Sequence, residues 1–251
     1  DFVDDLANVV PAVLTMGMLG LPLTDWVVYC DPIHAQVYTP PTSPDFPRVM
    51  EQTMAMVARM TECVAEIRQT RKPGMIQALV DADFDGRSLP DQGIISTVSL
   101  LMGGGFDTTT SLLAGALDWL DLHPAERPRL LTEDGLIDTA TEEFLRWFTP
   151  AQGGGRTITQ DCTIGGYEFK ALDRVFMSYA LSNHDPAVFE NPDEIVLDRW
   201  PNRHAAFGLG VHRCIGSNLA RQGFKVMLTR VLERMPDFRV ERDGIVQYES
   251  I

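Results

Sequence analysis

The stretch FGLGVHRCIG, residues 207–216, decides how the rest of the chain is interpreted. Two glycines, Gly208 and Gly210, precede Cys214, and apolar residues at near-helical spacing follow over residues 215–232. Cys214 is therefore expected where a glycine-rich turn gives way to the N-terminus of a helix. Unpaired backbone N–H groups and the positive end of the helix dipole favour the thiolate form of a cysteine in that position.

A thiolate at this point is a candidate ligand for iron. Gly208 and Gly210 permit backbone conformations with positive φ and a close approach of the main chain to the sulfur, and Gly216 leaves room for a flat cofactor. A lone cysteine near glycines is more often a small buried hydrophobe, but the spacing within this stretch favours a ligand. The other three cysteines form no C-x-x-C pair and no disulfide-like framework, which fits a reducing compartment.

Composition limits the class of protein. The chain has 251 residues, 45% of them hydrophobic, which is enough for one globular unit over residues 1–251. The net charge of −14 argues against nucleic acid or an anionic membrane as a partner. No apolar run is long enough to span a bilayer, and the acidic start is unlike a signal peptide. We expect a cytoplasmic protein.

Hydrophobic periodicity predicts a mainly α fold with a small β portion. Helices are expected from residue 2 to a stop at residues 20–22, over residues 49–71 and over residues 90–122, with a proline-rich loop at residues 38–47. Strands are expected over residues 156–164, 167–169 and 175–181, the first two joined by a hairpin at Gly165 and Gly166. Met54, Met56 and Met60 are expected to fill the core.

Two helical segments carry polar groups with more than one interpretation. The long central helix contains MGGGFDTTTS, and its three glycines should lower the stability of the helix by about 3 kcal/mol relative to alanine. Either a neighbouring group needs the space that missing side chains leave, or the helix is simply weak at this point. Glu143 and Arg146 lie three apart on one helical face. Taken alone, that pair is an ordinary exposed ion pair.

The ten residues of the glycine-rich turn resemble the haem-ligand loop of the cytochrome P450 family, Phe-Gly-x-Gly-x-His/Arg-x-Cys-x-Gly, at every fixed position. The central helix is similar to the family's pattern Ala/Gly-Gly-x-Asp/Glu-Thr, and TEEFLRWF to its Glu-x-x-Arg. Members of the family are longer, so the chain resembles the later part of their fold, truncated at both ends. The resemblance implies one haem-binding domain that holds haem b between the central helix and the loop of Cys214.

The resemblance also implies roles for individual residues. Cys214 is the axial iron ligand, and Asp107 and Thr108 supply a proton route. The cofactor is contacted by Gly104, Gly105, Arg156, Phe207, Gly208, His212 and Gly216, with Arg156 and His212 reaching the propionates. The substrate is contacted by Leu100, Gly103, Gly104, Ala151, Gln152, Gly153 and Gly154, and the small residues of the last four indicate a roomy pocket.

Two further groups are expected outside the pocket. Glu143, Arg146 and Arg199 should form a buried structural network under the ligand loop. An electron donor should dock on a basic patch made of Arg203, Arg213, Arg221 and Lys225, although a solvated helix face is the simpler interpretation of these residues. His184 and His204 have no place in the family pattern and are expected at the surface.

The implied function is monooxygenation. A haem-thiolate enzyme of this kind inserts one oxygen atom of O2 into a C–H bond of a small hydrophobic organic substrate. His212 before the ligand is similar to the soluble bacterial type, which receives electrons from a ferredoxin and its reductase. Two alternatives stay open: a haem-binding fragment without turnover, and a haem-thiolate enzyme that uses peroxide or rearranges an oxygenated substrate. The intact pair of Asp107 and Thr108 argues against a dedicated peroxide user.

Overall fold

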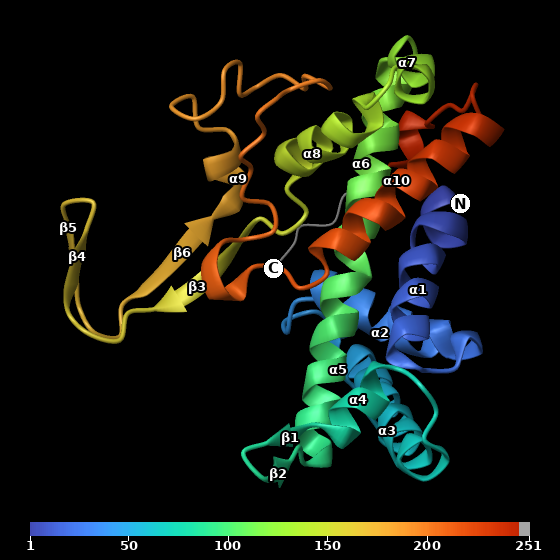
Figure 1. Ribbon diagram of the computed structural model, residues 1–251, viewed down its shortest axis with the longest axis vertical. Coiled ribbons are helices and arrows are strands. Elements are labelled where there is room, and N and C mark those ends of the chain that lie inside the picture. The colour runs from blue at the N-terminus through green and yellow to red at the C-terminus, as the bar shows by residue number, and fades with distance from the viewer. Residues whose placement is uncertain (246–251) are drawn as a thin grey trace. The chain divides into compact units, whose positions relative to one another are not determined.

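The computed structural model describes residues 1–245, which are mainly helical with three small antiparallel sheets of two strands each (Figure 1). The chain divides into two compact units, residues 1–110 with 240–245 and residues 111–239, and the boundary falls inside one helix. The mainly α fold with a small β portion is confirmed, while the single domain over residues 1–251 stays a prediction.

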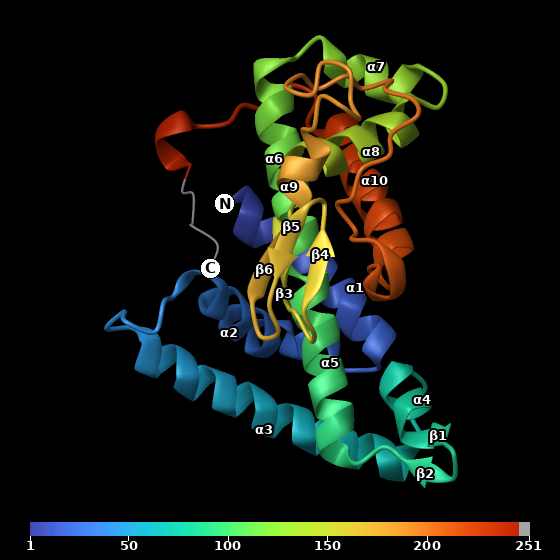
Figure 2. The same ribbon diagram turned by 90° about the vertical axis from the view of Figure 1, so that its left-hand side faces the viewer.

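The first unit is helical apart from one short hairpin, and its longest helix is α3 (Figure 2). Its elements are the π-helical turn η1 (Val3–Ala7), α1 (Val9–Leu19), the 3-10 turn η2 (Leu23–Asp25), α2 (Trp26–Tyr38), α3 (Phe46–Thr70), α4 (Met75–Asp81), the hairpin of β1 (Asp83–Phe84) and β2 (Arg87–Ser88), α5 (Asp91–Gly105) and the 3-10 turn η4 (Arg242–Gly244).

Glycine sets the end of α1. Gly20 follows the helix with φ of +88°, so the predicted stop is confirmed. A Cβ on Gly74 would lie 2.7 Å from the Cα of Gly20, so the two backbones meet where no side chain fits. Helix α2 has no counterpart among the predicted helices, and α3 begins three residues earlier than predicted.

The core of the first unit gathers side chains from α1, α2, α3 and α5. Met56 and Met60 of α3 are buried in it, as predicted, beside Met102 and Phe106. The expectation for Met54 is wrong, because 63% of that residue is exposed. Met54 lies on the flank of α3, away from the stripe of buried residues that faces α5.

The long central helix expected over residues 90–122 is two helices, α5 (Asp91–Gly105) and α6 (Asp107–Leu122), interrupted at Phe106. Three successive glycines weaken the helix just before the break. After it, the hydroxyl of Thr108 donates to the carbonyl of Gly104 at 2.8 Å, and that of Thr110 donates to Ala7 at 2.7 Å. Hydroxyls that compete for backbone carbonyls bend or interrupt a helix.

The second unit combines helices with a twisted ribbon of strands (Figure 1). Its elements after α6 are α7 (Glu126–Thr132), α8 (Leu136–Phe148), β3 (Gly153–Thr157), β4 (Cys162–Ile164), β5 (Tyr167–Phe169), β6 (Arg174–Ser178), α9 (Tyr179–Asn183), the 3-10 turn η3 (Gly210–His212) and α10 (Ser217–Arg234). β3 pairs with β6 and β4 with β5, both antiparallel.

The turns of this ribbon follow the sequence closely. Gly165 and Gly166 both have positive φ between β4 and β5, so the predicted hairpin is confirmed. The strand expected over residues 175–181 ends at Ser178 instead. There the Ser178 hydroxyl accepts the backbone N–H of Leu181 at 3.1 Å and starts helix α9.

A buried carboxylate fixes the irregular chain between α9 and the ligand loop. Glu143 of α8 accepts two hydrogen bonds from Arg146 and one from Arg199, all at 2.9 Å. It also accepts the backbone N–H of Val196 at 2.8 Å and the side-chain amide of Asn202 at 3.0 Å. Segments distant in sequence are thus held on one carboxylate.

The charges in this network are matched. The side chains of Glu143 and Arg146 are fully buried, and that of Arg199 is 10% exposed. Burial alone would raise the pKa of Glu143, but the guanidiniums of Arg146 and Arg199 and the N–H of Val196 outweigh it and hold the pKa below its ordinary value. Arg146 also donates to the carbonyl of Asn183 at the end of α9 and to those of Pro192 and Glu194 in the irregular segment.

We predict that Glu143→Ala lowers the free energy of unfolding of the haem-free chain by about 3–5 kcal/mol, because two buried guanidiniums lose their counter-charge. Urea unfolding followed by circular dichroism measures the loss. Glu133→Ala is the matched control, since it removes an exposed bidentate partner of Arg129 and should leave the midpoint nearly unchanged. Equal midpoints for the two variants would contradict a structural role for Glu143.

Candidate haem-thiolate site

The ligand loop of the second unit is shaped by glycines. Gly208 and Gly210 adopt φ of +66° and +69°, the left-handed conformations that the sequence predicts for them. The backbone N–H of Cys214 donates to the carbonyl of Phe207 at 2.8 Å and so closes the loop on itself. Helix α10 begins three residues later, at Ser217, whose N–H points back to the Cys214 carbonyl at 3.4 Å.

The surface of this loop is largely apolar, and its thiol is half-buried. Leu209 is 74% exposed, Val211 97% and Ile215 84%, so three apolar side chains of the loop that carries Cys214 are open to solvent, alongside the exposed His212 and Arg213. A Cβ on Gly216 would meet the sulfur at 3.9 Å and nothing nearer. A soft sulfur donor in an open apolar setting fits a flat, largely apolar macrocycle that carries iron.

The two groups expected at the propionates lie at the surface of the same unit. Arg156 of β3 is exposed, and its guanidinium donates to the carbonyl of Gly155 at 2.7 Å. His212 is exposed in η3, two residues before Cys214. Their roles toward a cofactor stay predictions.

Neighbouring groups lie where Gly153 and Gly154 lack side chains, so the small size of these two glycines is no sign of a roomy pocket, and the pocket itself stays a prediction. A Cβ on Gly153 would lie 2.4 Å from the carbonyl of Met177 and 2.5 Å from the Phe176 ring, and one on Gly154 would lie 3.3 Å from the Tyr179 hydroxyl. These glycines are therefore small because neighbouring groups occupy the space. Ala151 and Gln152 are exposed just before the strand.

In the first unit, α5 has an open face near its C-terminal end, just before the helix is interrupted at Phe106. Leu100 is 75% exposed, and a Cβ on Gly103 or Gly104 would meet no atom within 4 Å. Gly105 differs from the expectation, because its Cβ would lie 2.7 Å from the hydroxyl oxygen of Thr15 on α1. Gly105 is thus required for the packing of α1 against α5 and does not open toward a cofactor.

Asp107, the acidic residue of the predicted central helix, pairs with a residue that was not predicted from the sequence. The carboxylate of Asp107 contacts the Nδ1 atom of His34 on α2, and both side chains are 19% exposed. Burial alone would lower the pKa of His34, but Asp107 and Cys30 raise it to about 10, so the imidazole is cationic at neutral pH. Only the spacing of Cys30 and His34, one helical turn apart, hinted at a cluster on α2.

The expected basic patch is partly neutralised by acids. Arg221 donates to both carboxylate oxygens of Glu142, at 2.6 and 2.7 Å, and Lys225 donates to Asp138 at 2.7 Å. These two cations therefore complement α8, so the alternative of a solvated face that complements nothing is wrong for them, while the docking role of the patch stays a prediction. Arg203 and Arg213 are exposed and form no ion pair within residues 1–245.

His204 also departs from the expectation of a surface position. Its side chain is 4% exposed, and its Nε2 atom lies 3.0 Å from an oxygen of Glu142. Burial alone would raise the pKa of Glu142, but Arg221 and His204 outweigh it and lower the pKa to about 2. His184 is partly buried, and its ring packs against Trp147.

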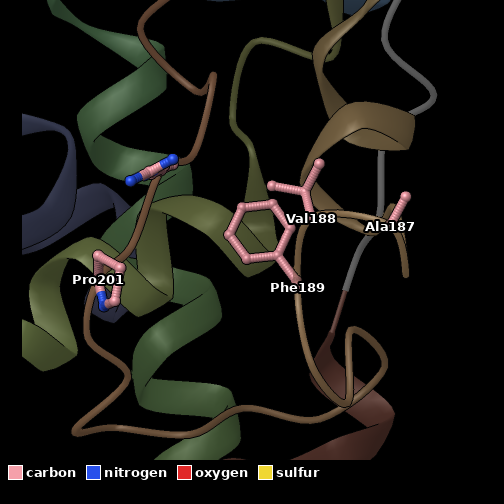
Figure 3. A pocket seen from close by; sticks show the side chains of 5 residues that line it. Ala187, Val188, Phe189 and Pro201 are labelled. Carbon is pink, nitrogen blue, oxygen red and sulfur yellow. The ribbon is translucent and has the colours of Figure 1, made fainter.

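A hollow of about 360 Å³ opens in the irregular segment that precedes the ligand loop (Figure 3). Its lining includes Val188, the ring of Phe189, Pro201 and Arg203. The guanidinium of Arg146 stacks on the Phe189 ring at 5.3 Å, so the wall of the hollow is part of the Glu143 network. Of its lining residues, only Arg203 belongs to a predicted site.

The comparisons with known proteins agree with one another. The sequence pattern of the family described as Cytochrome P450 matches residues 18–247. The chain is 30% identical to the steroid C26-monooxygenase of Mycolicibacterium smegmatis over 98% of its length, and 32% identical to the methyl-branched lipid omega-hydroxylase of Mycobacterium tuberculosis over 94%. It spans 62% and 56% of those two proteins.

Solved structures give the same result. The substrate-free CYP109E1 of Bacillus megaterium superposes with a TM-score of 0.87 at 29% identity, covering 98% of this chain and 65% of that one. The mixed-function P450 MycG superposes with a TM-score of 0.84 at 30% identity, covering 98% and 62%. Among residues 1–245, no helix has the length and apolar character to cross a membrane. The chain therefore belongs to the cytochrome P450 family.

Proposed function

We propose that the chain binds haem b through Cys214 and hydroxylates a small hydrophobic organic substrate with O2 and electrons from a ferredoxin. The observation that carries the proposal is the ligand loop: left-handed glycines present the half-buried Cys214 thiol among exposed apolar side chains. When bound, the haem supplies iron for O2 chemistry, and a thiolate ligand donates electron density that favours O–O cleavage.

The residues of the second unit hold the cofactor in this proposal. Cys214 is the iron ligand, and its backbone N–H is already engaged by Phe207. Arg156 and His212 are exposed cations or donors that bind the propionates. Gly216 adds no side chain next to the sulfur and so would leave room for the cofactor.

The residues of the first unit position the substrate and move a proton. Leu100, Gly103 and Gly104 offer an open, apolar helix face. The Thr108 hydroxyl stands one helical turn beyond it, and Asp107 beside it is held by the protonated Nδ1 of His34. In this route Asp107 and Thr108 relay the proton, and His34, which stays protonated, holds the Asp107 carboxylate in place.

The relatives support a hydrophobic substrate and a hydroxylation. Their names include a steroid C26-monooxygenase, a methyl-branched lipid omega-hydroxylase and a vitamin D3 dihydroxylase of Streptomyces griseolus. Each name describes oxidation of an apolar molecule. For this chain we propose the same class of reaction, with the substrate drawn from the same chemical class.

Replacing Cys214 by Ala should abolish the thiolate-type carbon monoxide difference spectrum of the reduced, haem-loaded protein, because no other described cysteine lies on the ligand loop. Cys162→Ala is the control, since that thiol is also half-buried but lies on β4. An unchanged spectrum in Cys214→Ala would refute the proposed ligand and with it the proposed function.

Thr108→Ala should retain haem and substrate binding but divert reducing equivalents into hydrogen peroxide or water, because the last hydroxyl of the proton route is lost. Product and peroxide are quantified per electron consumed. Thr97→Ala is the matched control, since that hydroxyl makes the same 2.8 Å bond to a carbonyl one turn earlier, at Gly93. Unchanged coupling in Thr108→Ala would remove Thr108 from the proton route.

Charge reversal at Arg203 and Arg213 should slow electron transfer from an acidic ferredoxin by about tenfold at low salt, because steering by exposed charges is screened only weakly there. Stopped-flow reduction over a salt series measures the rate. Arg230→Glu is the control, because Arg230 is an exposed cation near the far end of α10. Equal rates for all variants at every salt concentration would place the docking surface elsewhere.

A further inference from the structure

A second charged cluster lies next to the Glu143 network and uses a different carboxylate. Glu142 binds Arg221 of α10 through both oxygens, at 2.6 and 2.7 Å, and His204 through one, at 3.0 Å. The side chains of Glu142, Arg221 and His204 are 22%, 23% and 4% exposed. Bidentate pairing of a carboxylate with guanidinium fixes orientation as well as distance.

This cluster reaches the first residue of the ligand loop from two sides. The Arg221 guanidinium lies over the Phe207 ring, 4.5 Å from its centroid, and the His204 ring is 6.0 Å from the same ring. His204 Nδ1 also accepts the backbone N–H of Ala206 at 3.2 Å, which leaves Nε2 as the donor to Glu142. The ring and the preceding backbone of Phe207 are therefore both anchored to Glu142.

Phe207 forms a backbone hydrogen bond with Cys214, the predicted iron ligand. The carbonyl of Phe207 accepts the backbone N–H of Cys214 at 2.8 Å, so the two ends of the loop share one hydrogen bond. A change in the position of Phe207 is transmitted to Cys214 through this bond and through the two left-handed glycines between them. By contrast, Lys225 lies one turn after Arg221 on α10 and pairs with Asp138, whose side chain is 64% exposed.

We propose that Glu142, Arg221 and His204 are positioning residues that hold Phe207 and thereby set the position of the Cys214 thiol. In this assignment Arg221 serves the ligand loop and is not a docking residue for an electron donor. The inference rests on the proposed role of Cys214 as ligand, but the geometry that it concerns exists without haem.

The first test therefore uses the haem-free chain. Alkylation by iodoacetamide is followed site by site by peptide mass spectrometry in the wild type, Arg221→Met and Lys225→Met. We expect Cys214 to react severalfold faster in Arg221→Met, because the loop opens more often once Phe207 is released. Cys162, on β4 of the same unit, should react at an unchanged rate, which shows that the second unit stays folded, and the buried Cys30 and Cys63 of the first unit should stay protected.

Lys225→Met is the matched control, because it removes a cation and an ion pair from the same helix without touching Phe207. Equal Cys214 rates in Arg221→Met and Lys225→Met overturn the proposal. If Arg221→Met does not fold, His204→Leu and Arg221→Lys take its place. Lysine keeps the charge but not the planar fork, so a severalfold faster rate in either variant supports the proposal, and wild-type rates in both overturn it.

The second test uses the haem-loaded protein and separates this proposal from the proposed function. Arg221→Met should shift part of the carbon monoxide spectrum away from the thiolate type, while the salt dependence of reduction by ferredoxin stays that of the wild type. A full thiolate-type spectrum in Arg221→Met overturns the positioning role while the proposed function stands. A wild type without a thiolate-type spectrum refutes the proposed function, and the alkylation rates then decide the positioning role alone.

Discussion

Two adjacent carboxylates on α8 control the arrangement of the second unit. Glu143 is fully buried, and a buried charge is tolerated only when opposite charges and hydrogen-bond donors surround it. Its partners come from the same helix and from the irregular segment before the ligand loop, so these hydrogen bonds fix the backbone of that segment relative to α8. Glu142, one residue earlier, points to a different set of partners and binds α10.

The same helix turn thus serves two segments because neighbouring residues of a helix face directions about 100° apart. Glu143 faces the irregular segment. That segment has few backbone hydrogen bonds of its own, so side chains must bind its carbonyls. The other direction, that of Glu142, leads to the first residue of the ligand loop and to the helix that follows it. In our proposal, the loop geometry that positions the Cys214 thiol depends on one of these carboxylates, Glu142.

Glycines in this chain have three distinct purposes, and only their surroundings separate them. Gly208 and Gly210 are needed for their positive φ. Gly105 and Gly153 are needed because a neighbouring side chain or carbonyl occupies the place of a Cβ. Gly103 and Gly104 leave open space beside α5, which is the property expected of a surface that receives a flat or bulky ligand. The amino-acid composition does not distinguish these three kinds of glycine.

The sequence by itself determined the family, the mainly α fold, the β4–β5 hairpin and the left-handed turns of the ligand loop. These features depend on local patterns: periodicity, glycine placement and a ten-residue motif. Tertiary structure alone decided the pairing of His34 with Asp107, the burial of His204 and the neutralisation of Arg221 and Lys225. Each of these depends on residues far apart in the chain, and the partner of a charge is set by which helices pack together, which no spacing within one segment encodes.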